Sequence, residues 1–127
     1  MGKDNILMFV YGTLKKGFGN HFFLENCKYV GEAKLHGHAI YHLGHFPGVL
    51  PSFSDRDAVI GEVYEVDPTS LVNIDRLEGN GFLYIRKDVE VELADKKQIV
   101  QTYIYNKIVN SEWQIKDGVF RKDLPHG

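Results

Sequence analysis

The clearest pattern along the chain is a change from continuous to alternating apolar positions. Residues 6–11 form an uninterrupted apolar and aromatic run of strand length. Such a run is typical of a strand covered on both faces. Residues 58–66 and 83–93 instead alternate in side-chain character, as expected of strands with two different faces. Residues 98–105 follow after a polar turn and are the predicted antiparallel partner of residues 83–93.

The segments between these strands are less regular. Residues 27–43 have a strand-like pattern, in which Gly31 and Gly37 suggest bulges or close backbone approaches. Residues 46–51 are apolar and contain two prolines, and they are predicted to form a loop. Asn20 is a candidate cap for one or two helical turns that follow it.

One main helix is predicted over residues 68–78. Asp67 is suited to cap it, Pro68 is suited to the first helical position, and Gly79 is a good terminator. Many strands, one helix and short connections indicate an α+β fold built on a small, closed or partly closed, mixed β-barrel. The last twenty or so residues are expected to be irregular, with Trp113 and Phe120 holding them against the body.

Length and composition narrow the class of protein. A chain of 127 residues with 43% hydrophobic content predicts a single globular domain over residues 1–127. A formal charge of −2 gives no reason to expect a nucleic-acid or membrane partner. No apolar stretch approaches the length of a membrane span, so a cytoplasmic protein is expected. The oligomeric state stays open, with a monomer as the favoured expectation.

The apolar run of residues 6–11 ends in a loop bounded by Gly12 and Gly17. A buried strand that ends in such a loop leaves backbone N–H groups unpaired, and these groups can bind an anion or a developing oxyanion. The loop is not a Walker phosphate loop, because Phe18 and Gly19 stand where that motif requires Lys and Ser or Thr. An ordinary tight turn is the alternative, and these residues alone leave both interpretations open.

A glutamate occupies an unexpected position on the predicted helix. Glu78 follows Ile74 by four residues and Leu71 by seven, so its carboxylate lies on the apolar stripe of the helix. Burial and the negative end of the helix dipole both disfavour the charged form, so we expect a raised pKa. Such a carboxyl group is suited to acid–base catalysis near neutral pH. The alternative is a glutamate at the helix rim that reaches solvent or Arg86.

Other reactive side chains have simpler interpretations. Four histidines raise the question of a metal site, namely His36, His38, His42 and His45. No carboxylate ligand stands at a recognisable spacing, so strand-surface histidines are the favoured interpretation. Cys27 is the only cysteine and is interpreted as a small core residue rather than a nucleophile. Asp75 is expected to be a solvated surface residue or a partner of Arg76 or a nearby lysine.

The order and spacing of several short motifs resemble those of the γ-glutamyl cyclotransferase-like superfamily. The motifs are Phe9-Val10-Tyr11-Gly12-Thr13-Leu14-Lys15-Lys16-Gly17, Asn20-His21, Gly61-Glu62-Val63-Tyr64, Asp75-Arg76-Leu77-Glu78-Gly79, Tyr84 with Arg86, and Tyr103-Ile104-Tyr105. The Lys-Lys-Gly and Asn-His elements make the chain most similar to γ-glutamylamine cyclotransferase. The resemblance covers residues 6–105.

The resemblance implies a β-barrel-like fold with a cavity, and no metal or organic cofactor. In such enzymes the Tyr-Gly-Thr-Leu loop binds the glutamyl or oxoproline moiety through backbone groups. That loop corresponds here to Tyr11, Gly12, Thr13 and Leu14. The essential glutamate corresponds to Glu78, and a cavity-lining tyrosine corresponds to Tyr84. The segment after Tyr105 matches poorly, so no substrate contact there is carried over.

The expected activity is conversion of a γ-glutamyl amide, such as γ-glutamyl-lysine, to 5-oxoproline and a free amine by intramolecular aminolysis, with Glu78 as general acid and base. The leaving group stays open among γ-glutamyl-lysine, γ-glutamyl peptides, glutathione and a biosynthetic γ-glutamyl intermediate. A non-catalytic module of the same fold that binds a small acid is the second hypothesis. A nucleic-acid-binding barrel is disfavoured, because the chain lacks a basic stripe.

Overall fold

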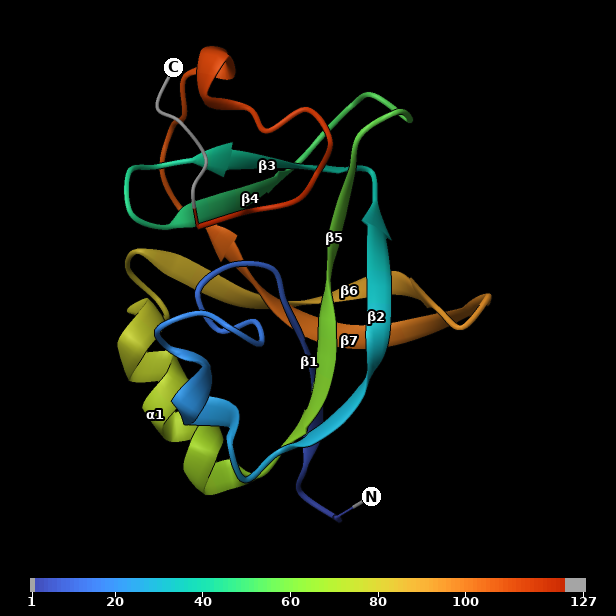
Figure 1. Ribbon diagram of the computed structural model, residues 1–127, viewed down its shortest axis with the longest axis vertical. Coiled ribbons are helices and arrows are strands. Elements are labelled where there is room, and N and C mark those ends of the chain that lie inside the picture. Colours follow the sequence, from blue (N-terminus) through green and yellow to red (C-terminus); the bar gives the residue numbers. More distant parts are fainter. Residues whose placement is uncertain (1, 123–127) are drawn as a thin grey trace.

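The computed structural model describes residues 2–122, which form a five-stranded closed barrel in the order β1-β5-β2-β6-β7 (Figure 1). The strands are β1 (Ile6–Val10), β2 (Lys28–His36), β5 (Ala58–Val66), β6 (Tyr84–Leu93) and β7 (Lys96–Tyr105). Neighbouring strands are antiparallel, except that β1 closes the barrel against β7 in parallel, with Met8 opposite Gln101. The predicted mixed β-barrel is therefore confirmed.

A separate two-stranded ribbon lies at one end of the barrel (Figure 1). It pairs β3 (His38–His42) with β4 (Pro47–Pro51), with Ile40 opposite Val49. The strand-like pattern of residues 27–43 is confirmed, with a register irregularity between Tyr29 and Gly31 and a break at Gly37, which has φ 72° and separates β2 from β3. One expectation was wrong here. Residues 46–51 contain a strand rather than a loop, because its two prolines stand at its ends, where a missing N–H is tolerated.

The main helix, α1 (Pro68–Glu78), has the predicted bounds. Asp67 caps it, since Asp67 Oδ2 accepts the Ser70 N–H at 3.1 Å. Gly79 ends it in the left-handed conformation, with φ 61° and ψ 47°. Two one-turn 3₁₀ helices complete the described elements, η1 (His21–Leu24) and η2 (Ser111–Trp113). In the described part of the chain, no helix is long and apolar enough to cross a membrane.

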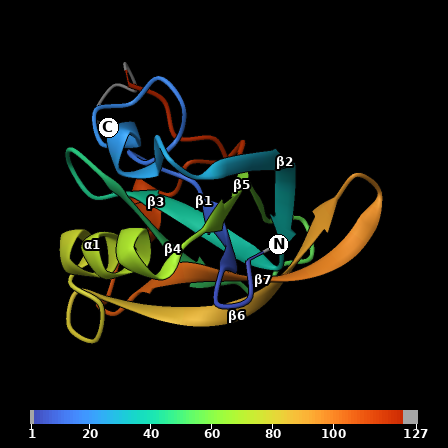
Figure 2. The same ribbon diagram turned by 90° about the horizontal axis from the view of Figure 1, so that it is seen from below.

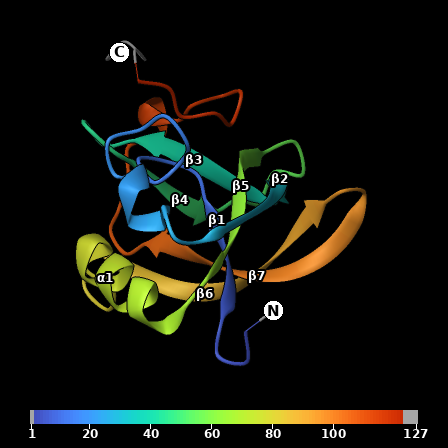
Figure 3. The ribbon, with the colours of Figure 1, turned by 60° about the horizontal axis from the view of Figure 1, so that its bottom comes forward.

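Strand β1 is covered on both faces, as its continuous apolar run predicted. Phe9 and Tyr11 point into the core of the barrel, while Met8 and Val10 belong to a second core. That second core lies under α1 and η1 and includes fully buried Ile74 of the helix. Figures 2 and 3 show α1 on one side of the barrel, away from the projecting turn between β6 and β7. The carboxyl end of β1 therefore emerges close to the helix.

The segment after β7 is irregular, as predicted, but only one of its two expected anchors is buried. Phe120 is 5% exposed, whereas Trp113 is 46% exposed. The second buried anchor is Ile115, and its N–H donates to the Ile40 carbonyl at 2.8 Å. Trp113 lies in the one-turn helix η2, which does not bury its aromatic ring.

Candidate active site

A pocket lies where the carboxyl end of β1 meets the end of α1. It holds about 330 Å³ of empty space, including the solvent at its mouth. Its walls come from β1 and the following loop, the start of β4, the last residue of α1, and strands β6 and β7: Phe9, Val10, Tyr11, Gly12, Thr13, Leu14, Phe46, Pro47, Glu78, Tyr84 and Tyr103. The structure thus brings all six predicted site residues into one pocket.

Glu78 places a partly buried carboxylate in this pocket. Burial raises the pKa of Glu78 to about 7. Within residues 2–122 its carboxylate is neither the acceptor of a hydrogen bond nor a member of a salt bridge, so nothing there offsets the lost hydration. The expected position on the helix stripe is confirmed by Ile74, one turn earlier, which is fully buried. The alternative contact to Arg86 is absent, because Arg86 pairs with Asp75.

The loop after β1 presents unpaired donors to the same pocket. Among the hydrogen bonds of the described residues, none uses the N–H of Gly12, Thr13 or Leu14. The N–H of Lys15, by contrast, donates to the Gly12 carbonyl at 3.0 Å and turns the chain. Consecutive free N–H groups in a turn can bind a carboxylate or an oxyanion.

Asn20 and His21 stabilise this loop through hydrogen bonds to Thr13 and Leu14. The Asn20 side chain donates from Nδ2 to Thr13 Oγ1 at 2.9 Å, and its backbone N–H donates to the Thr13 carbonyl at 3.1 Å. His21 Nδ1 donates to the Leu14 carbonyl at 2.9 Å. Asn20 was expected to cap the following turn, but it makes no side-chain capping bond. Its side chain instead fixes Thr13, which lines the pocket.

Three tyrosines of the pocket direct their hydroxyl groups to acceptors other than Glu78. Tyr11 donates to the Tyr103 carbonyl at 2.6 Å, and Tyr84 donates to the Pro47 carbonyl at 2.6 Å. The Tyr103 hydroxyl donates to Asp75 Oδ1 at 2.5 Å. Burial raises the pKa of each phenol well above its ordinary range, with the charge of Glu78 adding to the effect. All three therefore stay neutral, and they leave Glu78 as the group that can exchange protons near pH 7.

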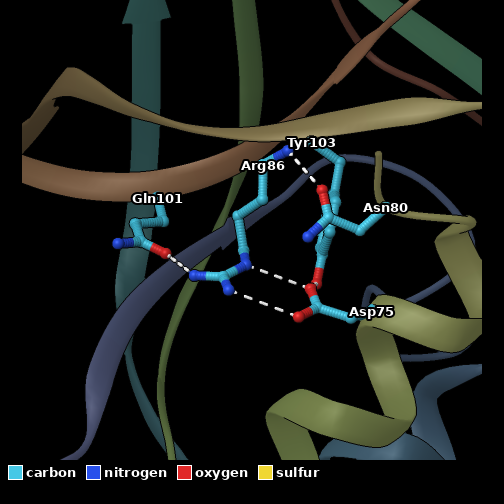
Figure 4. A network of polar contacts seen from close by, with 5 residues as sticks. All are labelled: Asp75, Asn80, Arg86, Gln101 and Tyr103. Carbon is cyan, nitrogen blue, oxygen red and sulfur yellow. Dashed lines mark hydrogen bonds and ion pairs between the residues drawn. The ribbon is translucent and has the colours of Figure 1, made fainter. Parts of the chain in front are cut away.

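Asp75 anchors the end of α1 to the barrel (Figure 4). Its carboxylate accepts two hydrogen bonds from the Arg86 guanidinium, in addition to the bond from Tyr103. Arg86 also donates to Gln101 Oε1 on β7, and its backbone N–H donates to Asn80 Oδ1 at 2.8 Å. The expectation of a solvated Asp75 paired with Arg76 was wrong. Helical periodicity did not reveal the inward position of Asp75, because α1 packs on the barrel over a wider arc than its apolar residues suggest.

The sequence interpretation missed five pocket residues, Phe9, Val10, Phe46, Pro47 and Tyr103. Phe46 and Pro47 belong to the predicted loop of residues 46–51, and their apolar character was the available signal. Phe9, Val10 and Tyr103 were noted only as parts of motifs.

None of the four candidate histidines lines this pocket. His36 pairs with Glu92 at 2.8 Å, and His38 bonds to the carbonyl of His36. His42 and His45 line a second pocket. Within residues 2–122 no three His, Cys, Asp or Glu side chains gather in an arrangement that could hold a metal ion. Cys27 is only partly buried, at the edge of the core under α1.

Comparison with known proteins identifies the family. Residues 8–122 match the family model described as gamma-glutamyl cyclotransferase, AIG2-like. The chain belongs to this family. A Methanocaldococcus jannaschii relative is 38% identical over 99 residues, which cover 77% of this chain and 81% of that protein. The gamma-glutamylcyclotransferase family protein YtfP of Escherichia coli K12 is 30% identical over 111 residues, which cover 87% of this chain and 92% of that protein.

Solved structures of the same fold agree. An AIG2-like protein from Mus musculus has a TM-score of 0.82 and 25% identity, and the match covers 96% of this chain and 92% of that one. YkqA from Bacillus subtilis has a TM-score of 0.76 and 29% identity, with 91% of this chain covered. The match spans only 39% of YkqA, so this chain corresponds to about two fifths of that protein.

Proposed function

We propose that this protein is a cyclotransferase that converts a γ-glutamyl amide, such as γ-glutamyl-lysine, to 5-oxoproline and a free amine. The proposal rests on one observation, which is that a carboxyl group and unpaired backbone N–H groups lie in the same pocket. A carboxyl group whose pKa is about 7 shares that pocket with three consecutive backbone N–H groups that have no partner among residues 2–122. Membership of the gamma-glutamyl cyclotransferase, AIG2-like family supports the same reaction class.

The reaction supplies its own nucleophile. The α-nitrogen of the substrate attacks the γ-carbonyl carbon, a five-membered lactam closes, and the bond from that carbon to the amide nitrogen breaks. Well-oriented intramolecular reactions reach effective molarities of about 10⁵–10⁸ M. The protein therefore has to fold the substrate, stabilise the oxyanion and move protons.

Glu78 is the proposed proton carrier. Ionised Glu78 takes a proton from the substrate α-ammonium and frees the lone pair for attack. The α-nitrogen loses two of its three protons as it becomes the lactam N–H, and the departing nitrogen gains two as it leaves as an ammonium ion. A single carboxylate can carry these protons one at a time. Proton delivery to the departing nitrogen is required because an alkyl amine does not leave as an anion.

The loop after β1 is the proposed anion site. The N–H groups of Gly12, Thr13 and Leu14 bind the substrate α-carboxylate or the oxyanion that forms on the γ-carbonyl. Tyr11 and Tyr84 form walls around the glutamyl half, and their hydroxyl groups stay bonded to the protein. This arrangement needs no cofactor.

The test is a substrate panel with mass-spectrometric detection of 5-oxoproline. The panel contains γ-glutamyl-lysine, γ-glutamyl-alanine, glutathione and a γ-glutamyl alkylamide. We expect wild-type protein to release 5-oxoproline and Glu78→Gln to lose about 10²–10⁴-fold in turnover. Glu90→Gln is the matched control, since its exposed side chain lies on β6 and pairs only weakly with Lys97. Equal turnover by wild type and Glu78→Gln would refute the role of Glu78. If no substrate gives 5-oxoproline while the glutamyl compounds still bind, the protein is a binding module.

A further inference from the structure

A second pocket lies directly beside the first. It holds about 700 Å³ of empty space, including the solvent at its mouth, and is lined by Thr13, Phe18, Gly19, His42, Gly44, His45, Phe120 and Lys122. Thr13 lines both pockets, and His45 in the second precedes Phe46 in the first. A molecule bound in the first pocket therefore reaches the second pocket when it extends past Thr13.

The second pocket carries positive and hydrogen-bond-donating groups. Its lining residues within residues 2–122 include an ammonium group and two imidazole rings, and none of these described residues carries a carboxylate. The Lys122 ammonium lies 5.6 Å from the centre of the Phe18 ring, and the Lys15 ammonium lies 5.1 Å from the same centre. The neighbouring Arg121 pairs with Asp117 at 2.6 Å, whereas Lys122 forms no ion pair within residues 2–122. The pocket is thus complementary to an anion.

The remaining walls are apolar or open. Phe18 and Phe120 stack with ring centres 5.7 Å apart and make one wall. At Gly19 and at Gly44, a Cβ atom would meet no other atom within 4 Å, so larger residues there would extend into open space. The pocket therefore combines an apolar wall with a cationic group.

We propose that this second pocket binds the leaving half of the substrate and recognises a carboxylate on it. The inference rests on the proposed function and deepens it. Lys122 and His45 contact the carboxylate, while Phe18 and Phe120 pack against the carbon chain of the same half. The substrate class is then a γ-glutamyl amino acid or short peptide with a free carboxylate. A γ-glutamyl polyamine is disfavoured, because its distal ammonium would meet a like charge, and none of the described lining residues is acidic.

The test compares matched substrates that differ only in this carboxylate. Each of γ-glutamyl-alanine and ε-(γ-glutamyl)lysine is assayed beside the derivative in which the carboxylate of the leaving half is a carboxamide. The measured quantity is the ratio of kcat/KM for the acid to kcat/KM for its amide. A charge-assisted hydrogen bond to the carboxylate predicts a ratio of about 10 or more for at least one pair in wild-type protein.

Variants assign the ratio to the pocket. Lys122→Gln and His45→Gln are each expected to bring the ratio several-fold closer to one. Lys97→Gln is the matched control, because it removes the same charge from an exposed side chain at the far end of the β6–β7 hairpin (Figure 1). It is expected to keep the wild-type ratio. Thermal unfolding of each variant checks that the fold is retained.

The outcomes separate the two proposals. Turnover with a ratio near one for both pairs overturns the carboxylate inference and leaves the proposed reaction standing. The carboxylate inference is also overturned if a high acid-to-amide ratio is unchanged in Lys122→Gln and His45→Gln. It is likewise overturned if the ratio falls equally in Lys97→Gln. Absence of 5-oxoproline from every substrate overturns the proposed reaction and the inference with it.

Discussion

Asp75 and Arg86 form a bidentate ion pair that joins the last turn of α1 to the barrel. Arg86 Nε lies 3.0 Å from Asp75 Oδ1, and Arg86 Nη2 lies 3.3 Å from Asp75 Oδ2. Both side chains are 24% exposed, so water screens the pair only in part. Asp75 precedes Glu78 by three residues on the same helix, and the pair therefore fixes the turn that carries the candidate proton carrier.

Replacing this guanidinium should therefore affect both stability and turnover. Arg86→Lys keeps the charge but loses the two-pronged geometry and the bond to Gln101. We expect the free energy of unfolding to fall by about 1–3 kcal/mol, as for a partly buried polar network. Turnover should fall as well, because Glu78 loses its fixed position. Chemical denaturation and the 5-oxoproline assay measure the two effects.

Arg121→Lys is the control for that change. Arg121 pairs with Asp117, and their side chains are 52% and 56% exposed. Exposed pairs contribute little, so its effect on stability should stay below about 1 kcal/mol. If Arg86→Lys destabilises no more than Arg121→Lys does, the network does not anchor the helix.

The pH dependence of turnover should follow the ionisation of Glu78. Glu78 must be ionised to accept a proton, and its pKa is about 7 because of burial. We expect kcat/KM to rise with pH as a single ionisation centred near pH 7, tenfold per pH unit on the acid side. Glu90→Gln should keep this profile. A midpoint near 4.5, the ordinary value for a glutamate, would mean that Glu78 is not the group that titrates.

The same burial predicts a pH-dependent effect on stability. The pKa of Glu78 is about 7 in the folded protein against 4.5 for an exposed glutamate, so folding favours the protonated form. This contribution is fully present below pH 4.5 and is lost as the pH rises through 7, since the folded protein must then bury a charge. A shift of this size corresponds to about 3 kcal/mol as an upper value.

Glu78→Gln removes that penalty. Relative to wild type, we expect the variant to have nearly equal stability at pH 4 and to be more stable by about 1–3 kcal/mol at pH 8. Urea unfolding at the two pH values measures the difference. An equal stability difference at both values would show that Glu78 titrates normally in the folded protein.

Much of this site could be predicted from local sequence patterns, and the rest could not for identifiable reasons. The bounds of α1 followed from Asp67, Pro68 and Gly79, because capping depends on neighbouring residues. Helical spacing predicted the inward position of Glu78 as one of two open interpretations, and the structure selects it. Asp75 was misjudged because its partners, Arg86 and Tyr103, come from strands that only the closed barrel brings to the helix.

The ribbon of β3 and β4 likewise depends on a pairing between segments that local sequence patterns did not predict. Residues 46–51 contain prolines and were predicted as a loop, yet Pro47–Pro51 pairs with β3. The decisive feature is the partner strand, since a two-stranded ribbon tolerates prolines at the ends of an edge strand. Pro47 and Phe46 could then be placed in the pocket only from the structure.

Gly12 and Pro47 offer a direct test of how tightly the pocket is built. A Cβ atom on Gly12 would lie 2.6 Å from Pro47 Cγ and 2.7 Å from Pro47 Cδ, which is shorter than any allowed contact. The proline ring is rigid, so Gly12→Ala must displace either the loop with its N–H groups or the start of β4. Displacement of binding groups by about 1 Å can lower turnover by about 10²-fold. We expect a loss of that order in kcat/KM.

A double mutant makes the cause explicit. Pro47→Ala removes the ring that Gly12→Ala strikes, so the double variant should recover part of the activity that Gly12→Ala alone loses. Gly31→Ala is the matched control, because its Cβ would meet only the mobile end of Leu93, at 3.0 Å. Additive losses in the double variant would exclude the steric mechanism.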